Sequence, residues 1–284
     1  MTHLRSNPIG FTLVELLVVI AVVGILMAVL LPAIHSVRES SRRAQCQSNL
    51  KQIGIALRSY HETWGVFPRG GWPAASNNLS WSASILPHLE EQLVYLQINP
   101  DKPYTDASNF TAGRTVLQMF ICPTAPHSAM LKPSPDLPAT STTNLYARSH
   151  YGAMEGERGL RASNATNNPE RGSMILASNI ALKDITDGAS KTIQIAEAPE
   201  GMSSLWFSVK NLYDQSAPIN TLATYSPQYI YFDYGQEIHS YHRGGANALF
   251  ADGAVHFLSQ TMSNSTLAAL CSRAGDDLIS GDAF

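Results

Sequence analysis

The feature that most constrains this chain is an apolar run near its amino terminus, FTLVELLVVIAVVGILMAVLL at residues 11–31. The run has 21 residues and one ionisable side chain, that of Glu15. A helix of this length spans about 31 Å, close to the hydrocarbon thickness of a bilayer. Because the run is apolar all round, it is a poor match to an amphipathic helix lying on a membrane surface. We therefore expect a transmembrane helix over residues 11–31.

Two ordinary explanations of such a run fit less well. A secretory signal peptide has an apolar region of roughly 7 to 15 residues followed by a small-residue cleavage site, and the residues after Pro32 (Ala-Ile-His) offer none. A plain uncleaved anchor would leave Glu15 unexplained. A carboxylate in a membrane segment costs up to about 3 kcal/mol near the centre and usually marks a function.

The residues that open the run resemble a known processing signal. The sequence GFTLVE, from Gly10 to Glu15, followed by a long apolar segment, resembles the prepilin signature. The resemblance implies that residues 1–10 are a leader, that a prepilin peptidase cuts between Gly10 and Phe11, and that the new amino group of Phe11 is methylated. It also implies that Glu15 pairs with the terminal amine of a neighbouring subunit, which would offset the cost of its charge.

The same resemblance sets the expected function. It implies a single-pass protein of the cytoplasmic (inner) membrane with an extracytoplasmic domain, whose partners are the membrane, prepilin peptidase and other pilin-like subunits. It further implies a structural subunit of a type IV pilus-like or type II secretion-like filament, in the periplasm or at the cell surface. The alternative is a membrane-tethered binding module that does not assemble, and a tethered metal-dependent enzyme is less favoured.

The charges that flank the run predict the opposite orientation of the protein in the membrane. The segment before it contains only Arg5 and the chain's amino terminus, whereas four basic residues follow it: Arg38, Arg42, Arg43 and Lys51. Positive charges alone would place the large domain in the cytoplasm. We give more weight to the processing signature, because it is more specific than a count of flanking charges.

The apolar pattern continues beyond Pro32 at a spacing of three and four residues, which predicts an amphipathic continuation of the helix over residues 32–64. Its apolar stripe comprises Ile34, Val37, Ala44, Leu50, Ile53, Leu57, Tyr60 and Trp64. Gly65 and Pro68 supply the stop signal. Residues 65–284 are rich in Pro, Gly, Asn and Ser, which predicts short strands and long loops.

The expected fold is α+β and pilin-like, with a long amino-terminal helix packed on a globular domain with an antiparallel sheet. Within this domain, residues 192–196 predict a strand after an Asp187-Gly188 turn, and residues 81–94 and 114–122 predict short helical or packed segments. Residues 123–143 predict an irregular loop.

The clearest strand signal is a hairpin at residues 242–258. Asp-Gly between two apolar segments favours a two-residue type I′ turn. With that turn, Phe250 would face Val255 and Ala248 would face Phe257, which makes one side of the hairpin wholly apolar.

The hairpin also extends the family resemblance. His242, nine intervening residues, then Asp252 and Gly253 resemble the H-x9-D-G signature of prepilin-type proteins whose globular domain has no known function. Residues 48–70, the Cys122-Pro123 pair and residues 185–192 resemble the same family.

Three cysteines, Cys46, Cys122 and Cys271, are too few for a disulfide-rich scaffold and contain no CxxC pair. The residues alone leave all three pairings open, as well as three buried thiols. The family resemblance points to a disulfide between Cys46 and Cys122, and Cys271 departs from the family pattern.

Composition and motifs narrow the remaining functions. A net charge of -3 with 14% charged residues supplies no basic patch, so we expect no nucleic acid partner. No G-x-S-x-G, HExxH or P-loop sequence occurs, so we expect no enzyme, no catalytic residues and no cofactor. A metal site is not expected either, although two sets of side chains carry suitable ligand atoms: His239, His242, Asp252 and His256, and, for calcium, Asp276, Asp277 and Asp282.

Overall fold

The structure is a computed structural model that describes residues 13–71, 80–126, 129–138, 144–158, 160, 172–176, 178–199, 204–221 and 237–275. It divides into two units, residues 1–42 and 43–284, and each unit is described by itself. The predicted cleavage residues Gly10 and Phe11 lie outside the described residues, as do the three carboxylates considered for calcium.

The first unit contains the amino-terminal part of helix α1 (Leu13–Trp64), which continues through Pro32. Every large apolar side chain from Leu13 to Leu31 is between 48% and 78% exposed. This helix is long and apolar enough to cross a membrane, and its most apolar window is not buried at all. An apolar surface of this extent needs lipid or other protein to cover it.

The second unit buries one side of the rest of α1. The buried side chains include the predicted Leu50, Ile53 and Leu57, whereas Trp64 at the end of the stripe is 66% exposed. Gly65, with a φ of 73°, donates its amide hydrogen to the carbonyl oxygen of His61 at 2.7 Å. This is a glycine C-terminal cap, and it explains why the helix ends where the sequence predicts.

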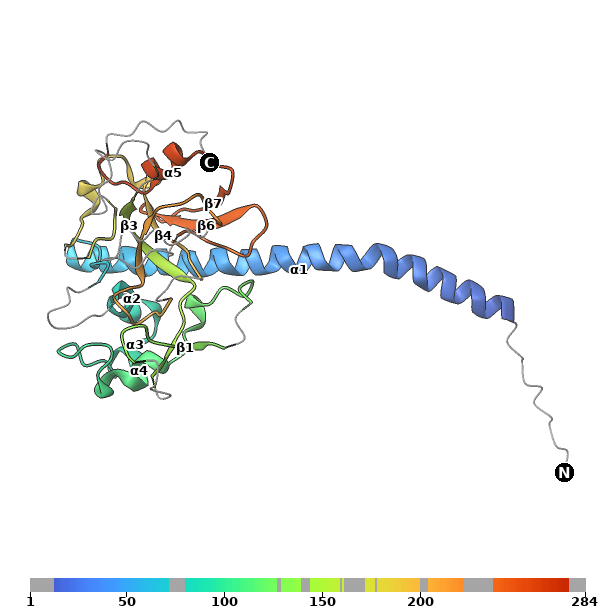
Figure 1. Cartoon of the computed structure of the whole chain (residues 1–284), viewed down its shortest axis with the longest axis horizontal. Helices are drawn as coiled ribbons and strands as arrows, with labels where there is room; N and C mark the ends of the chain where they lie inside the picture. Colours follow the sequence, from blue (N-terminus) through green and yellow to red (C-terminus); the bar gives the residue numbers. More distant parts are fainter. Residues whose placement is uncertain are drawn as a thin grey trace, which may run out of the picture. The chain divides into compact units, whose positions relative to one another are not determined.

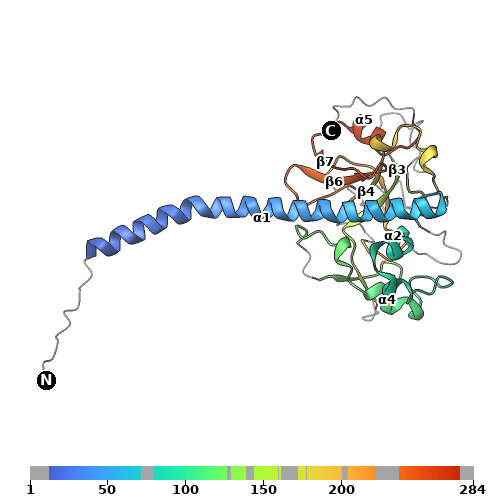
Figure 2. The same ribbon diagram turned by 180° about the vertical axis from the view of Figure 1, so that it is seen from behind.

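Residues 43–64 of α1 lie between two layers of the second unit (Figures 1 and 2). One layer is built from short helical segments and a two-stranded antiparallel sheet. Its elements are α2 (Trp81–Ile85), η1 (Leu86–Leu89), α3 (Gln92–Tyr95), η2 (Ala107–Asn109), α4 (Phe110–Arg114), η3 (Gln118–Phe120), β1 (Leu131–Pro133) and β2 (Leu145–Ala147). The fully buried rings of Trp81, Phe120 and Trp206 pack in this layer, with Phe120 stacked on Trp206 at 6.3 Å.

The other layer is a five-stranded sheet in the order β5-β3-β4-β6-β7. Its strands are β3 (Tyr151–Glu157), β4 (Ile193–Glu197), β5 (Leu212–Gln215), β6 (Gly245–Phe250) and β7 (Val255–Ser259). The 3-10 turns η6 (Leu182–Asp184) and η7 (Ala189–Lys191) precede β4, and α5 (Asn264–Leu270) packs on the sheet face away from α1. Among the described strands of this sheet, only β3 and β5 pair in parallel, so the predicted α+β, pilin-like fold is confirmed with a mixed sheet.

The predicted hairpin is present, but its predicted register is wrong by one residue. Leu249 pairs with Val255 and Ala248 with His256. The Gly253 amide donates to the Phe250 carbonyl oxygen at 2.8 Å, the Phe250 amide donates to the Ala254 carbonyl oxygen at 2.9 Å, and Gly253 has a φ of 86°. These are the features of a three-residue loop with a glycine bulge, not of a two-residue type I′ turn.

In the corrected register, the two faces of β6 contact different parts of the domain. Asn247 and Leu249 point toward α1, whereas Ala246, Ala248 and Phe250 join the core beneath α5. A Cβ atom added to Gly54 of α1 would lie 2.7 Å from Leu249 Cδ1, so the glycine permits the close approach of helix and strand.

Strand β4 also departs from simple alternation. Its pairing with β6 shifts between Ile193 and Ile195, and these two side chains belong to the cores on opposite faces of the sheet. A bulge at this point has that effect because one extra residue reverses the alternation. Glu197 consequently lies on the same face as Ile195, which is the face that α1 covers.

Candidate functional site

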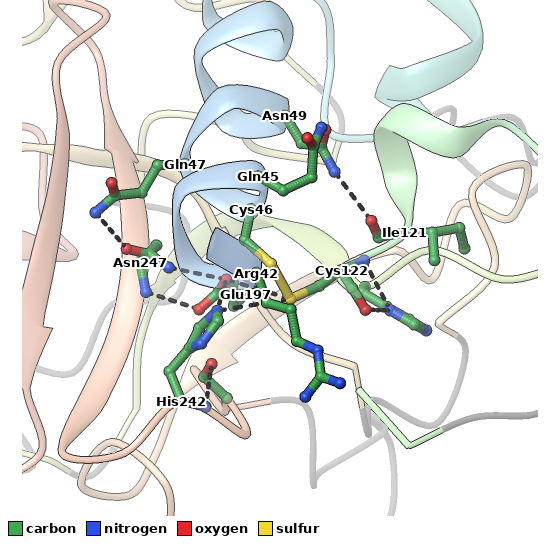
Figure 3. The surroundings of a disulfide bond; sticks show 12 residues. Arg42, Gln45, Cys46, Gln47, Asn49, Ile121, Cys122, Glu197, His242 and Asn247 are labelled. Carbon is green, nitrogen blue, oxygen red and sulfur yellow. Dashed lines mark hydrogen bonds and ion pairs between the residues drawn. A yellow bond between two sulfur atoms is a disulfide. The ribbon is translucent and has the colours of Figure 1, made fainter. Parts of the chain in front are cut away.

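Five buried polar and sulfur-containing residues meet where α1 crosses the sheet (Figure 3). We call Cys46, Cys122, Glu197, His242 and Asn247 the disulfide cluster. They come from α1, the segment after η3, the end of β4, the loop before β6, and β6 itself. All five are at most 4% exposed, so their chemistry is shielded from water.

Cys46 and Cys122 form a disulfide, the pairing implied by the family resemblance. Their Cα atoms are 5.3 Å apart, within the ordinary range for such a bond. The bond links α1 to the segment that precedes β1 and closes a sequence separation of 76 residues. Cys271 is buried on the other side of the sheet, at the end of α5, and lies outside this disulfide.

Glu197 is the charged centre of the disulfide cluster. Its Oε1 lies 3.4 Å from His242 Nε2, and each side chain is only 1% exposed. Its two carboxylate oxygens accept hydrogen bonds from Asn247, at 2.8 Å from the backbone amide and at 3.0 Å from Nδ2. Such a carboxylate is tolerated in the interior because Asn247 donates a hydrogen bond to each of its oxygens and the His242 ring lies beside it.

The orientation of Asn247 is set from α1. Gln47 Nε2 donates to Asn247 Oδ1 at 3.1 Å, so the amide nitrogen of Asn247 is left to face Glu197. The polar chain from Gln47 through Asn247 to Glu197 therefore fixes the register of α1 against β6.

The backbone around the two cysteines is held by further buried groups. The Cys122 backbone lies against the His150 ring, with its amide nitrogen 3.0 Å and its carbonyl oxygen 3.3 Å from His150 Nδ1. Asn49 Nδ2 donates to the Ile121 carbonyl oxygen at 2.9 Å, and to Tyr151 Oη at 3.3 Å. Burial, together with the negative charge of Glu197, raises the pKa of Tyr151 well above its usual value, so this hydroxyl stays protonated.

The tip of the hairpin contacts α1 through its backbone. Lys51 Nζ donates to the Gly253 carbonyl oxygen at 2.7 Å, and Arg58 donates to the Asp252 carbonyl oxygen at 3.0 Å. The Arg43 guanidinium carbon lies 3.4 Å above the centre of the Phe257 ring. Three basic side chains of α1 thus attach the hairpin to the helix.

The three residues of the H-x9-D-G pattern therefore meet α1 at both ends of the hairpin. His242 lies in the disulfide cluster, and the Asp252 and Gly253 carbonyls bind the next turns of the helix. Asp252 Oδ1 also accepts from the Ala254 amide at 2.8 Å, which stabilises the loop. That these residues form a family signature stays a prediction.

The histidines considered for a metal do not converge as a set. In the described part of the chain, His242 joins a group of potential ligands with Cys46, Cys122 and Glu197, and not with His239, Asp252 or His256. The His256 ring lies on the opposite sheet face, edge-on to Phe250 at 5.0 Å.

Glu197 and Asn247 were missed by sequence reasoning. A polar residue at the end of a strand, or alternating with alanine and leucine, is usually a solvent-facing position. Here α1 covers that face, and the only sequence signal was the mostly apolar IQIA segment, residues 193–196, that runs directly into Glu197.

A separate cavity of about 660 Å³ opens near the end of α1. Its lining combines the rings of Tyr60, Trp64, His88 and Tyr95 with aliphatic and small polar side chains, and Asp101 supplies its carboxylate. Its size is ordinary for a small-molecule pocket.

Two family models match the chain. The one described as "Prokaryotic N-terminal methylation motif" covers residues 5–31, and the one described as "Protein of unknown function (DUF1559)" covers residues 35–264. The type IV major pilin protein PilA of Myxococcus xanthus (strain DK1622) is 38% identical over 58 residues, which are 20% of this chain and 26% of that pilin. The chain thus matches about a quarter of its relative's length. No solved structure gives a significant match.

These findings define a prepilin-type, type IV pilin-like protein. They are the amino-terminal methylation motif, the apolar helix that continues into an α+β domain, and the likeness to a major pilin. Within that class, the chain belongs to the DUF1559 family, whose model spans most of its length.

Proposed function

We propose that this protein is cut by prepilin peptidase between Gly10 and Phe11 and then serves as a structural subunit of a pilus-like or secretion-associated filament. The observation that carries the proposal is the methylation motif at residues 5–31, whose apolar side chains from Leu13 to Leu31 are exposed on helix α1. In this account the helix crosses the cytoplasmic membrane once before assembly, and in the filament other helices replace the lipid around it.

The disulfide cluster supports an extracytoplasmic position for the domain. Disulfides persist in oxidising compartments and are rare in the cytosol. A buried Cys46–Cys122 bond therefore favours the outward orientation over the inward one that the flanking charges suggest. The bond would also hold α1 to the domain when a filament is pulled.

A structural role further accounts for the buried polar residues without catalysis. We propose that the protein is not an enzyme, because Glu197, His242 and Asn247 engage one another and connect α1 to the sheet. The aromatic cavity near Trp64 favours a second candidate function, in which the tethered domain binds a small ligand.

Replacing Glu15 by alanine should separate assembly from processing. Glu15 lies in the first turn of α1, within the segment that we place in the membrane. If its carboxylate pairs with the terminal amine of a neighbour, its loss should reduce incorporation into filaments by more than about tenfold. Immunoblots of sheared filaments and of membranes measure incorporation and leader removal together.

The matched control is Glu62→Ala, which removes an exposed carboxylate from the far end of the same helix and should change neither readout. If Glu15→Ala enters filaments as well as the wild-type protein does, Glu15 has no role in assembly and the helix is a plain anchor. Loss of cleavage would instead assign Glu15 to recognition by the peptidase.

A further inference from the structure

The disulfide cluster has the geometry of a metal site whose two sulfur ligands are oxidised. Cys122 Sγ lies 3.7 Å from His242 Nε2 and 3.8 Å from Glu197 Oε1, and those two atoms are 3.4 Å apart. With Cys46 Sγ included, the four ligand atoms all lie within 4.8 Å of one another.

These separations match the edges of a zinc tetrahedron. Zinc binds thiolate sulfur at about 2.3 Å, and imidazole nitrogen or carboxylate oxygen at about 2.0 to 2.2 Å. Tetrahedral angles then put any two ligand atoms roughly 3.3 to 3.8 Å apart. The three separations among Cys122 Sγ, His242 Nε2 and Glu197 Oε1 already fall in or at the end of this range. Cys46 Sγ lies within 4.8 Å of the other atoms, and it is too close only to Cys122 Sγ, to which the disulfide joins it.

We propose that, when the disulfide is reduced, Cys46, Cys122, Glu197 and His242 bind one divalent metal ion of the zinc class, and that oxidation of the two thiols closes the site. A dithiol reductant supplies two electrons and two protons to the sulfur–sulfur bond and becomes a disulfide itself. The metal then displaces both thiol protons and binds two thiolates. Re-oxidation by a disulfide oxidant passes the two electrons to that oxidant, which takes up two protons and becomes two thiols, and the closing of the Cys46–Cys122 bond releases the ion.

The donor set selects the class of metal. Two thiolates with an imidazole suit zinc and disfavour magnesium and calcium, which prefer sites made of oxygen atoms alone. All four ligands are buried, so such a site would be closed to substrate and structural in kind. In either redox state α1 would stay connected to the segment before β1 and to the loop before β6.

The surroundings provide the outer shell that metal ligands require. The carboxylate of Glu197 is oriented by two hydrogen bonds from Asn247, which is in turn oriented by Gln47. Outer-shell partners of this kind are usually worth 10- to 100-fold in metal affinity. They also distinguish an ordered site from two thiols that happen to lie near a histidine.

The test uses the full-length protein in detergent, reduced anaerobically with a phosphine and freed of metal with a chelator that is then removed. Cobalt(II) serves as the spectroscopic probe and zinc as its competitor. We expect one equivalent of cobalt to bind, with the visible bands of a tetrahedral ion and a thiolate charge-transfer band, and zinc to displace it. The oxidised protein should show neither signal.

Variants assign the ligands. His242→Ala and Glu197→Gln should remove or alter the tetrahedral spectrum, and Asn247→Ala should weaken binding by about 10- to 100-fold with all four ligands kept. His256→Ala and Cys271→Ala are matched controls outside the site and should leave the spectrum unchanged. Because reduced and oxidised wild-type protein are compared directly, the test does not depend on a variant that folds poorly.

Reduced wild-type protein that binds no cobalt, or binds it without a thiolate band, would overturn the proposal. A spectrum that His242→Ala leaves intact would overturn the four-ligand assignment. Neither result bears on filament assembly, because the inference rests only on the geometry of the second unit.

Discussion

Reduction of the Cys46–Cys122 disulfide, with a chelator present, should lower the free energy of unfolding of the detergent-solubilised protein by about 4 kcal/mol. The bond closes a sequence separation of 76 residues, and a loop of that length loses much conformational freedom in the unfolded chain. The loss should be a large fraction of the roughly 5 to 15 kcal/mol that usually separates folded from unfolded domains. Denaturant titration, followed by tryptophan fluorescence, measures the difference.

The double variant Cys46→Ala/Cys122→Ala provides the control for reduction. Its unfolding midpoint should be lower than that of the oxidised wild-type protein and should not change with reductant. Cys271→Ala should keep the full response of the wild-type protein to reductant. Equal midpoints for oxidised and reduced wild-type protein would show that the disulfide does not stabilise the domain.

Replacement of Glu197 by alanine should cost about 3 kcal/mol in the oxidised protein. The change leaves His242 without its buried carboxylate and leaves both Asn247 donors without an acceptor. Buried donors that lose their partner carry the full cost of having left water. The same denaturant titration measures this loss. Weaker contacts between α1 and the sheet should also appear as faster amide hydrogen exchange near Gln47.

Glu62→Ala is again the matched control, since an exposed carboxylate should change the free energy of unfolding by less than about 0.5 kcal/mol. Combining Glu197→Ala with Asn247→Ala should cost less than the sum of the two single changes, because both remove the hydrogen bond from Asn247 Nδ2 to Glu197 Oε1. Strict additivity would mean that the two side chains do not interact.

The amino-terminal helix was the most predictable part of this fold. Its apolar composition, its stripe at Leu50, Ile53 and Leu57, and the stop at Gly65 are local signals, and each has a direct physical meaning. The exposure of Trp64 was not predictable, because a stripe shows which residues can be buried but not where the covering layer ends.

The hairpin shows the limit of local signals more clearly. Asp252-Gly253 is compatible with a two-residue turn and with a three-residue loop that has a glycine bulge, and the two differ by one residue in register. Contacts made far along the chain favour the second arrangement. In that register Leu249 packs at Gly54, and Asn247 meets Gln47.

The disulfide cluster was predictable only in pieces. Cys46, Cys122 and His242 were named for separate reasons, and nothing in their spacing indicated that they meet. Glu197 reaches them because of the bulge in β4, and Asn247 because of the register of β6. Both are properties of the assembled sheet.

The central claim is that the chain is a prepilin processed at its methylation motif, and the amino terminus of the mature protein tests it most directly. Intact-mass and peptide mass spectrometry of protein purified from its native membranes should give a chain that begins at Phe11 and carries one methyl group on its amino nitrogen. A chain that still begins at Met1, or one cut after residue 32, would contradict the account.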